Sequence, residues 1–158
     1  MYKVKVEQGN LSFSAAHFIT FGGKCERLHG HNYAVSAVLA GNLTEDRYVF
    51  DFVELKKTIR RICDRLDHHF LLPGQSRHLD IRETEEEWEI RFEKRRYVFP
   101  AEDVLVLPVD SITAERLAEY ICGQFMESVN EKERSSLISI TVGVEEAPGQ
   151  AAFYQHSF

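Results

Sequence analysis

The stretch SFSAAHFITFGGKCERLHGHNY, residues 12–33, holds three of the chain's seven histidines within two extended runs. His29 and His31 are two residues apart, so in a strand their side chains point to the same face. His17 lies twelve residues before His29, and a pair of glycines between them lets the chain turn back. The pattern predicts two strands that bring three imidazoles within reach of one point.

Three neutral imidazoles around one point form a zinc site with an open fourth position, the arrangement of catalytic rather than structural zinc. Imidazole also suits copper, nickel and iron. Two histidines at this spacing also occur as ordinary surface residues, so spacing alone leaves both interpretations open. Cys25 stands four residues before His29, in Cys-x-x-x-His-Gly-His, and adds a thiol to the same stretch.

The composition favours one globular domain, expected to span residues 1–158. Hydrophobic residues make up 44% of the chain, which supports a packed core. The net charge of −6 gives no basic footprint for nucleic acid, and no apolar run is long enough to span a membrane. Three cysteines at unrelated spacings and an N-terminus without a signal-peptide core indicate the reducing cytoplasm.

Alternating apolar and polar residues predict strands, and apolar residues at helical spacing predict two helices. The expected strands cover residues 2–7, 13–18, 29–39, 48–52, 138–145 and a final run from 153. The expected helices cover 53–66 and a stretch that begins near Thr113, where several side chains offer capping oxygens. Cys63 and Cys122 fall on the apolar faces of these helices and are expected in the core.

With residues 75–107 set aside, the order strand–strand–helix–helix–strand–strand (ββααββ) predicts an α+β fold: an antiparallel sheet with two helices on one face. Residues 75–107 are a β-rich insertion in which Trp88, Ile90 and Phe92 alternate with charged neighbours. We expect the insertion to add one or two strands as a hairpin extension of the sheet, with its charges on a solvated face.

Two acidic positions outside the histidine stretch each allow two interpretations. Asp67 and His68 directly follow the first helix. They are either solvated or a pair in which the carboxylate orients the imidazole for acid–base catalysis. Glu146 shares the parity of the apolar residues in its strand, so it either faces solvent at the strand end or is buried for a reason.

Five motifs in order resemble the 6-pyruvoyltetrahydropterin synthase family, which includes the bacterial 6-carboxytetrahydropterin synthase of queuosine biosynthesis. They are FSAAH with Cys25 and HGH (13–31), FDFVELK (50–56), LDHHFL (66–71), TAERLAEYI (113–121) and EEAPGQAAFY (145–154). The resemblance implies the tunnelling fold, or T-fold. It also implies a homo-oligomer, commonly a hexamer of two trimers with active sites between subunits. Compact members have a shorter segment where this chain has its insertion.

The family acts on 7,8-dihydroneopterin triphosphate, a small-molecule pterin substrate. The resemblance implies that His17, His29 and His31 hold Zn²⁺, which binds the side-chain hydroxyls as a Lewis acid. Cys25 would remove a proton from the side-chain carbon as a thiolate, with a pKa lowered by nearby positive charge.

The resemblance also implies roles for residues beyond the histidine stretch. Asp67 and His68 would relay a second proton. Glu146 would accept two hydrogen bonds from the pterin's 2-amino and N3–H groups. Thr113 and Glu115 match a family region near the pterin.

The product is the point on which the branches of the family differ. The Cys-x-x-x-His-Gly-His spacing resembles the 6-carboxytetrahydropterin synthases, which release acetaldehyde and triphosphate. The 6-pyruvoyl enzymes of tetrahydrobiopterin-type pathways generally have a longer gap. A third branch uses Glu-x-x-His-Gly-His and forms 6-hydroxymethyl-dihydropterin.

This chain carries Cys25 and, at the spacing of the third branch, Glu26. Our hypothesis is that Cys25 acts and Glu26 is a bystander. Two further alternatives are a metal-binding module without turnover and a paralogue with a different substrate.

Overall fold

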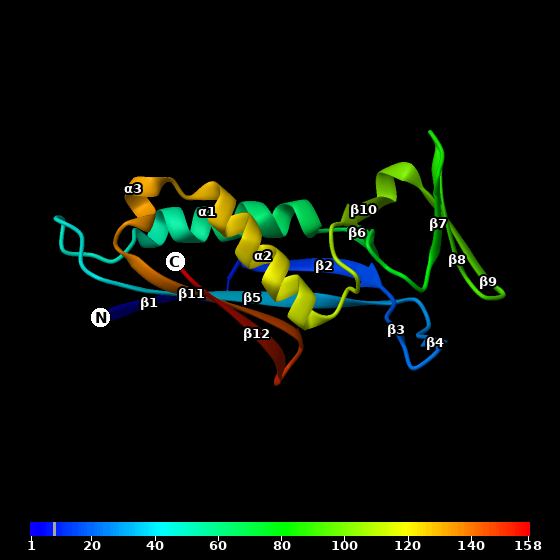
Figure 1. Ribbon diagram of the computed structural model, residues 1–158, viewed down its shortest axis with the longest axis horizontal. Coiled ribbons are helices and arrows are strands. Elements are labelled where there is room, and N and C mark those ends of the chain that lie inside the picture. The colour runs from blue at the N-terminus through cyan, green and yellow to red at the C-terminus, as the bar shows by residue number, and fades with distance from the viewer. Residues whose placement is uncertain (8) are drawn as a thin grey trace.

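The computed structural model describes residues 1–7 and 9–158, and Figure 1 shows helices on one side of a main sheet and a smaller sheet at one end. The strands are β1 (Tyr2–Val6), β2 (Ser12–His17), β3 (Thr20–Phe21), β4 (Lys24–Cys25), β5 (His29–Gly41), β6 (His69–Pro73), β7 (Asp80–Glu83), β8 (Glu87–Phe92), β9 (Arg95–Pro100), β10 (Val104–Leu107), β11 (Leu137–Ala147) and β12 (Gln150–Ser157). The helices are α1 (Phe52–Leu66), α2 (Ala114–Ser128) and α3 (Glu131–Arg134), with a 3₁₀ turn at Ala101–Asp103. No helix in the described residues combines the length and hydropathy needed to cross a membrane.

The main sheet has the strand order β10-β6-β2-β5-β11-β12. β5 is long enough to pair with β2 along its first half and with β1 along its second half. β6 runs parallel to β2 and β10 runs parallel to β6, while the remaining pairs are antiparallel. The expected α+β class is confirmed, and the sheet is mixed rather than wholly antiparallel.

β6, the strand that makes both parallel pairings of the sheet, has a sequence that does not alternate. β6 reads HFLLP, and its last four residues are all buried. A strand that is covered on both faces appears as a continuous apolar run, which alternation does not detect. The chain passes almost directly from α1 into β6. β6 pairs with β2 on one side and with β10 on the other.

α1 and α2 lie on one face of the main sheet and contact each other (Figure 1). Apolar residues at helical spacing are buried beneath them, among them Leu55 and Ile121. The odd-numbered residues of β5 from Tyr33 to Leu39 are buried in the core that the helices cover. Cys63 and Cys122 lie in this core, as expected.

The strand expected at residues 48–52 does not form. Asp51 instead begins α1, because its side chain accepts hydrogen bonds from the N–H groups of Val53 and Glu54. Phe52 is therefore the first helical residue, and Val49 and Phe50 are buried in the loop before it. A short apolar run fits a buried loop as well as a strand, so the sequence pattern did not distinguish them.

The insertion at residues 75–107, all of them described, builds a separate antiparallel sheet from β7, β8 and β9, and only β10 joins the main sheet. The β-rich character was correctly expected, but the insertion forms four strands rather than one or two, and the expected hairpin extension of the main sheet is wrong. One face of the separate sheet packs in a second hydrophobic cluster around the fully buried Ile90. This second cluster also contains Phe18, Cys25 and Phe70, so the insertion lies against the stretch that carries the histidines.

Candidate metal centre and active site

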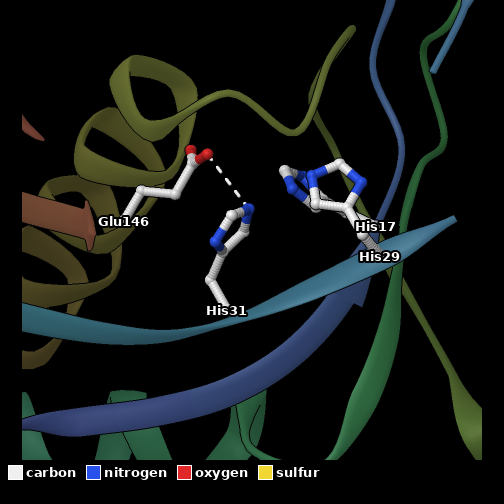
Figure 2. Close-up of side chains that lie close together, drawn as sticks. All are labelled: His17, His29, His31 and Glu146. Carbon is white, nitrogen blue, oxygen red and sulfur yellow. Dashed lines mark ion pairs between the residues drawn. The ribbon is translucent and has the colours of Figure 1, made fainter. Parts of the chain in front are cut away.

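Three histidines gather on one face of the main sheet, at the end where β2 stops and β5 begins (Figure 2). The β2–β5 register places His17 opposite His29 and Ala15 opposite His31, so all three imidazoles share that face. Their ring centroids are 4.6, 4.9 and 5.2 Å apart. One nitrogen from each ring and one oxygen of Glu146 all lie within 4.8 Å of one another. The strand pairing thus brings together the three imidazoles singled out in the sequence.

Backbone carbonyls set the orientation of two of these rings. His17 Nδ1 is 2.9 Å from the carbonyl oxygen of Ile112, and His29 Nδ1 is 2.8 Å from that of Arg27. A carbonyl oxygen only accepts, so each Nδ1 carries the hydrogen and each Nε2 keeps its lone pair. Metal-binding histidines are commonly held in this way through their second ring nitrogen.

The electrostatics of His17 favour the neutral ring. His17 is fully buried, and burial is the main cause of its lowered pKa. The neighbouring His29 and His31 lower the pKa further, while the hydrogen bond to Ile112 acts in the opposite direction. A lowered pKa keeps the imidazole unprotonated at neutral pH, which is the form that binds a metal ion.

Glu146 reaches the histidines from β11. Its Oε1 lies 3.0 Å from His31 Nε2, as Figure 2 shows, although the angles at this contact do not make a hydrogen bond. The neighbouring Glu145 instead faces the turn after β11, where its Oε1 accepts a hydrogen bond from the N–H of Gly149. Alternation along β11 therefore directs Glu146, and not Glu145, toward the three rings.

Cys25 lies in the second hydrophobic cluster, and its thiol is 3.4 Å from the carbonyl oxygen of Glu26. Burial raises the pKa of this thiol, and the positive charge of Arg95 offsets the effect only in part. The expected lowering of the Cys25 pKa is therefore wrong for this single chain.

Glu26 lies beside the histidines. Its Oε2 accepts a hydrogen bond from the N–H of Ile19 at 3.2 Å and is 4.0 Å from His29 Nε2. Its own N–H donates to the carbonyl oxygen of Ile19 at 2.9 Å. This carboxylate is thus held by the backbone next to one of the three imidazoles, a position from which it can act on a bound molecule.

Asp67 and His68 form a hydrogen-bonded pair where α1 ends. His68 Nδ1 is 2.8 Å from Asp67 Oδ2, and Asp67 Oδ1 accepts a hydrogen bond from the N–H of Ser14 at 2.7 Å. The hydrogen bond from Ser14 is the main cause of the lowered pKa of Asp67. His68 has a φ of 58° and a side chain that is 82% exposed. A histidine in this left-handed region is strained, and such strain gathers at functional sites.

Among the described residues, the Asp67–His68 pair is not part of the histidine cluster. His68 lines an open cavity of about 590 Å³, whose walls also include Ala15 and His31, two residues paired between β2 and β5. Ser14, Gly30 and Asn32 line it as well. These residues alternate along the strands with the three candidate metal ligands, so their side chains belong to the opposite face of the sheet. The sheet separates the pair from the imidazoles of its own chain.

Thr113 and Glu115 lie at the start of α2. Thr113 caps the helix, because its Oγ1 accepts a hydrogen bond from the N–H of Arg116 at 3.3 Å. It follows Ile112, whose carbonyl holds His17. Glu115 is exposed in the first turn of the helix. Thr113 is thus close in sequence to the support of the histidine cluster, and Glu115 points to solvent.

Comparison with known proteins identifies the family. Residues 7–157 match the family described as 6-pyruvoyl tetrahydropterin synthase. The chain belongs to this family. A relative from Methanocaldococcus jannaschii, provisionally named as a 6-carboxy-5,6,7,8-tetrahydropterin synthase, is 35% identical over 146 residues, which cover 92% of this chain and 90% of the relative.

Solved structures of the 6-pyruvoyl tetrahydropterin synthase family agree with this fold over its whole length. The crystal structure of the Plasmodium vivax 6-pyruvoyl tetrahydropterin synthase gives a TM-score of 0.95 at 38% identity and covers 99% of this chain and 98% of that one. Two further structures of the Plasmodium vivax enzyme carry a replacement of a glutamate that is described as a catalytic residue, by alanine in one and by cysteine in the other.

Family membership settles three expectations from the sequence. The resemblance carried by the five motifs is confirmed, and so is the T-fold. The sequence allowed either an enzyme, a pterin synthase, or a metal-binding module without turnover. The expectation of a pterin synthase is confirmed.

The donor atoms of the cluster fit a divalent transition metal. Three imidazoles and a carboxylate make a nitrogen–oxygen donor set that zinc accepts and that other metals of the same row also accept. His31 Nε2 is buried and forms no hydrogen bond with any described residue, as expected of an atom meant for another partner. The neutral His17 and the two carbonyl-bonded rings meet the other requirements of a ligand.

Tyr33 is a residue of this site that motif reasoning did not single out. Its hydroxyl lies 3.3 Å from His17 Nε2 and 3.4 Å from Nδ1, and the side chain is fully buried. Burial raises the pKa of Tyr33, so the phenol stays neutral and can donate a hydrogen bond. A signal was present in the sequence, because Tyr33 continues the parity of His29 and His31 along β5.

Proposed function

We propose that this chain is a zinc-dependent 6-carboxy-5,6,7,8-tetrahydropterin synthase. It would act on 7,8-dihydroneopterin triphosphate in the cytoplasm and serve the queuosine pathway. The observation that carries the proposal is the cluster of His17, His29, His31 and Glu146, with Cys25 at the spacing expected for this activity. The Methanocaldococcus jannaschii relative, which carries this name, supports it along nearly the whole chain.

His17, His29 and His31 would hold the zinc, and Glu146 would hold the pterin. Zinc supplies Lewis-acid polarisation of the hydroxyl and carbonyl oxygens of the substrate side chain. The Glu146 carboxylate would accept hydrogen bonds from the 2-amino and N3–H groups of the pterin. Glu146 Oε1 is 3.0 Å from His31 Nε2. A pterin ring bound to Glu146 would therefore have its side chain directed toward the three imidazoles.

Cys25 is the first candidate for the base that removes a proton from the substrate side chain. A thiolate performs this step, so the raised pKa of the buried thiol must fall when the site is assembled. A second copy of the chain or the bound substrate would have to supply that change. This requirement makes the role of Cys25 the part of the proposal most in need of a direct test.

Glu26 supports a second candidate activity, formation of 6-hydroxymethyl-dihydropterin. Its carboxylate accepts a hydrogen bond from the N–H of Ile19 and lies 4.0 Å from His29 Nε2. The Plasmodium vivax enzyme, 38% identical to this chain, uses a catalytic glutamate. A carboxylate that the backbone fixes beside one of the three imidazoles is placed to serve as the base, which is the physical argument in its favour.

The position of the Asp67–His68 pair supports the expected homo-oligomer, a hexamer built as a dimer of trimers. The pair lies across the sheet from the histidines of its own chain and next to an open cavity. It can relay a proton at a histidine cluster only if that cluster belongs to another copy. We therefore propose that each active site combines the cluster of one chain with the pair of a neighbour.

Turnover is the first experiment. Purified protein loaded with zinc would be incubated with 7,8-dihydroneopterin triphosphate, and the pterin products would be identified by mass spectrometry. A 6-carboxy product with acetaldehyde supports the proposal. A 6-hydroxymethyl product supports the second candidate, and a 6-pyruvoyl product moves the protein to the tetrahydrobiopterin-type branch. No product from folded, metal-loaded protein would contradict all three.

A matched pair of variants assigns the base. Cys25→Ala removes the thiol, and Glu26→Gln keeps the size of the side chain but removes its basicity. If Cys25 is the base, the first variant should lose activity by a factor of about a hundred or more and the second should retain it. The reverse result would assign the role to Glu26. Full activity in both variants would contradict either assignment.

A further inference from the structure

Arg95 of the insertion forms hydrogen bonds with the active-site stretch. Arg95 is the first residue of β9 and follows the tight turn that joins β8 to β9. Its Nη1 donates hydrogen bonds to the carbonyl oxygens of Cys25 at 2.7 Å and of Glu26 at 2.9 Å. A cation that donates to two successive carbonyls is a strong and directional contact. It joins two segments that are 70 residues apart in the sequence.

The two carbonyls belong to the two residues that compete for the role of base. The side chain of Cys25 lies in the second hydrophobic cluster, while that of Glu26 lies near His29. The direction of each side chain depends on the rotation of the peptide between them. β4 contains only Lys24 and Cys25, and the N–H of the Cys25–Glu26 peptide donates to the carbonyl oxygen of Ile19 at 2.9 Å. Arg95 holds the opposite side of the same peptide, its carbonyl oxygen, so the two bonds together fix its rotation.

Aromatic packing holds the strand that carries Arg95 in place. Tyr97 stacks on Phe18 with ring centroids 5.0 Å apart, and Phe99 stacks on Phe70 at 4.4 Å. Tyr97 and Phe99 belong to β9 and follow Arg95 by two and four residues. Such stacked pairs stabilise an interface beyond the area that they bury. Figure 1 shows the β7–β9 sheet and the β3–β4 hairpin at the same end of the molecule.

We propose that Arg95 is a positioning residue of the active site: it fixes the Cys25–Glu26 peptide, and through it the insertion becomes part of the catalytic apparatus. The proposal rests on the proposed function only in that Cys25 or Glu26 acts as the base. It holds for either residue, because the constraint acts on the peptide that both share. Arg95 contacts the backbone of both residues, and its positive charge also partly offsets the raised pKa of the Cys25 thiol.

The test compares three variants of the full chain. Arg95→Ala removes the contact, and Arg95→Lys keeps the charge and donors on a shorter side chain. Arg91→Ala is the matched control, since Arg91 lies on the same small sheet but bonds to Glu89. Misplacing a catalytic group costs a factor of about ten to a hundred in rate. We therefore expect kcat of Arg95→Ala to fall at least about tenfold with KM within about twofold, partial recovery in Arg95→Lys, and no change in Arg91→Ala.

A second measurement does not depend on activity. Amide hydrogen exchange of residues 19–28 should be faster in Arg95→Ala than in the wild type and unchanged in Arg91→Ala. If the wild type has no turnover on pterins but the exchange difference is present, the proposed function fails and the structural part of this proposal stands. Unchanged exchange and unchanged kcat in folded Arg95→Ala would overturn the proposal. Equal losses in Arg91→Ala and Arg95→Ala would also overturn it, since they would show only a general effect of the insertion.

Discussion

At the scale of single residues, the burial of Cys25 predicts an unreactive thiol in the free protein. Burial raises the pKa of Cys25, and iodoacetamide reacts with the thiolate. Alkylation should therefore be slow at neutral pH, with a midpoint above the ordinary thiol pKa of about 8.5. Peptide mass spectrometry across a pH series measures this. Cys63 and Cys122, with pKa values raised to about 12 and about 11, are slower internal references. A midpoint below that of a free thiol would contradict the expectation.

Glu146 poses a different question at the same scale, because its carboxylate could bind pterin or complete the metal ligands. Glu146→Gln keeps the shape but loses the charge that strengthens hydrogen bonds from the pterin. Losing such a charged hydrogen bond costs about 1.5–3 kcal/mol, so KM should rise about tenfold or more while the metal content per chain stays unchanged. Kinetics and metal analysis of the same preparation measure both. Glu145→Gln is the control, since its side chain faces the turn at Gly149. Lost metal at unchanged KM would make Glu146 a metal ligand instead.

At the scale of elements, Asp51 decides where α1 begins. Its side chain satisfies two N–H groups that the helix leaves open. Asp51→Ala should lower the free energy of unfolding by about 1 kcal/mol, as loss of an N-cap does. Urea denaturation measures this difference. Asp64→Ala, which removes an exposed ion pair with Arg60 four residues away, should cost no more than about 0.5 kcal/mol. Equal effects of the two changes would contradict a special role for the cap.

The elements also show which sequence signals are local and which are not. Alternation predicted β2, β5 and β11, and helical spacing predicted α1 and α2, because each of these elements has one covered and one open face. β6 is covered on both faces and left no alternation to detect. The insertion was correctly expected to be β-rich, but its partner was not, because the apolar face around Ile90 packs on Phe18 and Phe70, which no local pattern reveals.

At the scale of the whole molecule, the same distinction separates the predictable from the unpredictable part of the site. The three histidines share a face by parity, so spacing was enough to predict their cluster. Parity put Glu146 on the apolar side of its own strand, but it meets the histidines only because β11 pairs with β5. The place of the Asp67–His68 pair depends on which strand neighbours β2, and that is set by tertiary packing. The sequence therefore indicated the parts of the site but not that one chain holds them on two faces of its sheet.

Because the Asp67–His68 pair and the histidine cluster lie on two faces of the sheet, we predict that two inactive variants restore each other's activity when they assemble together. His31→Ala damages the cluster of its own chain, and His68→Ala damages only the pair. If each site joins the cluster of one chain to the pair of another, random mixing leaves about a quarter of sites intact. Complexes co-expressed with two tags and purified through both should thus show about a quarter of wild-type turnover. Mixing His31→Ala with His29→Ala is the control, and it should restore nothing, because both changes damage the cluster. Equal inactivity of both mixtures would show that each chain completes its own site. Full activity of His68→Ala by itself would show that the pair has no part in the reaction.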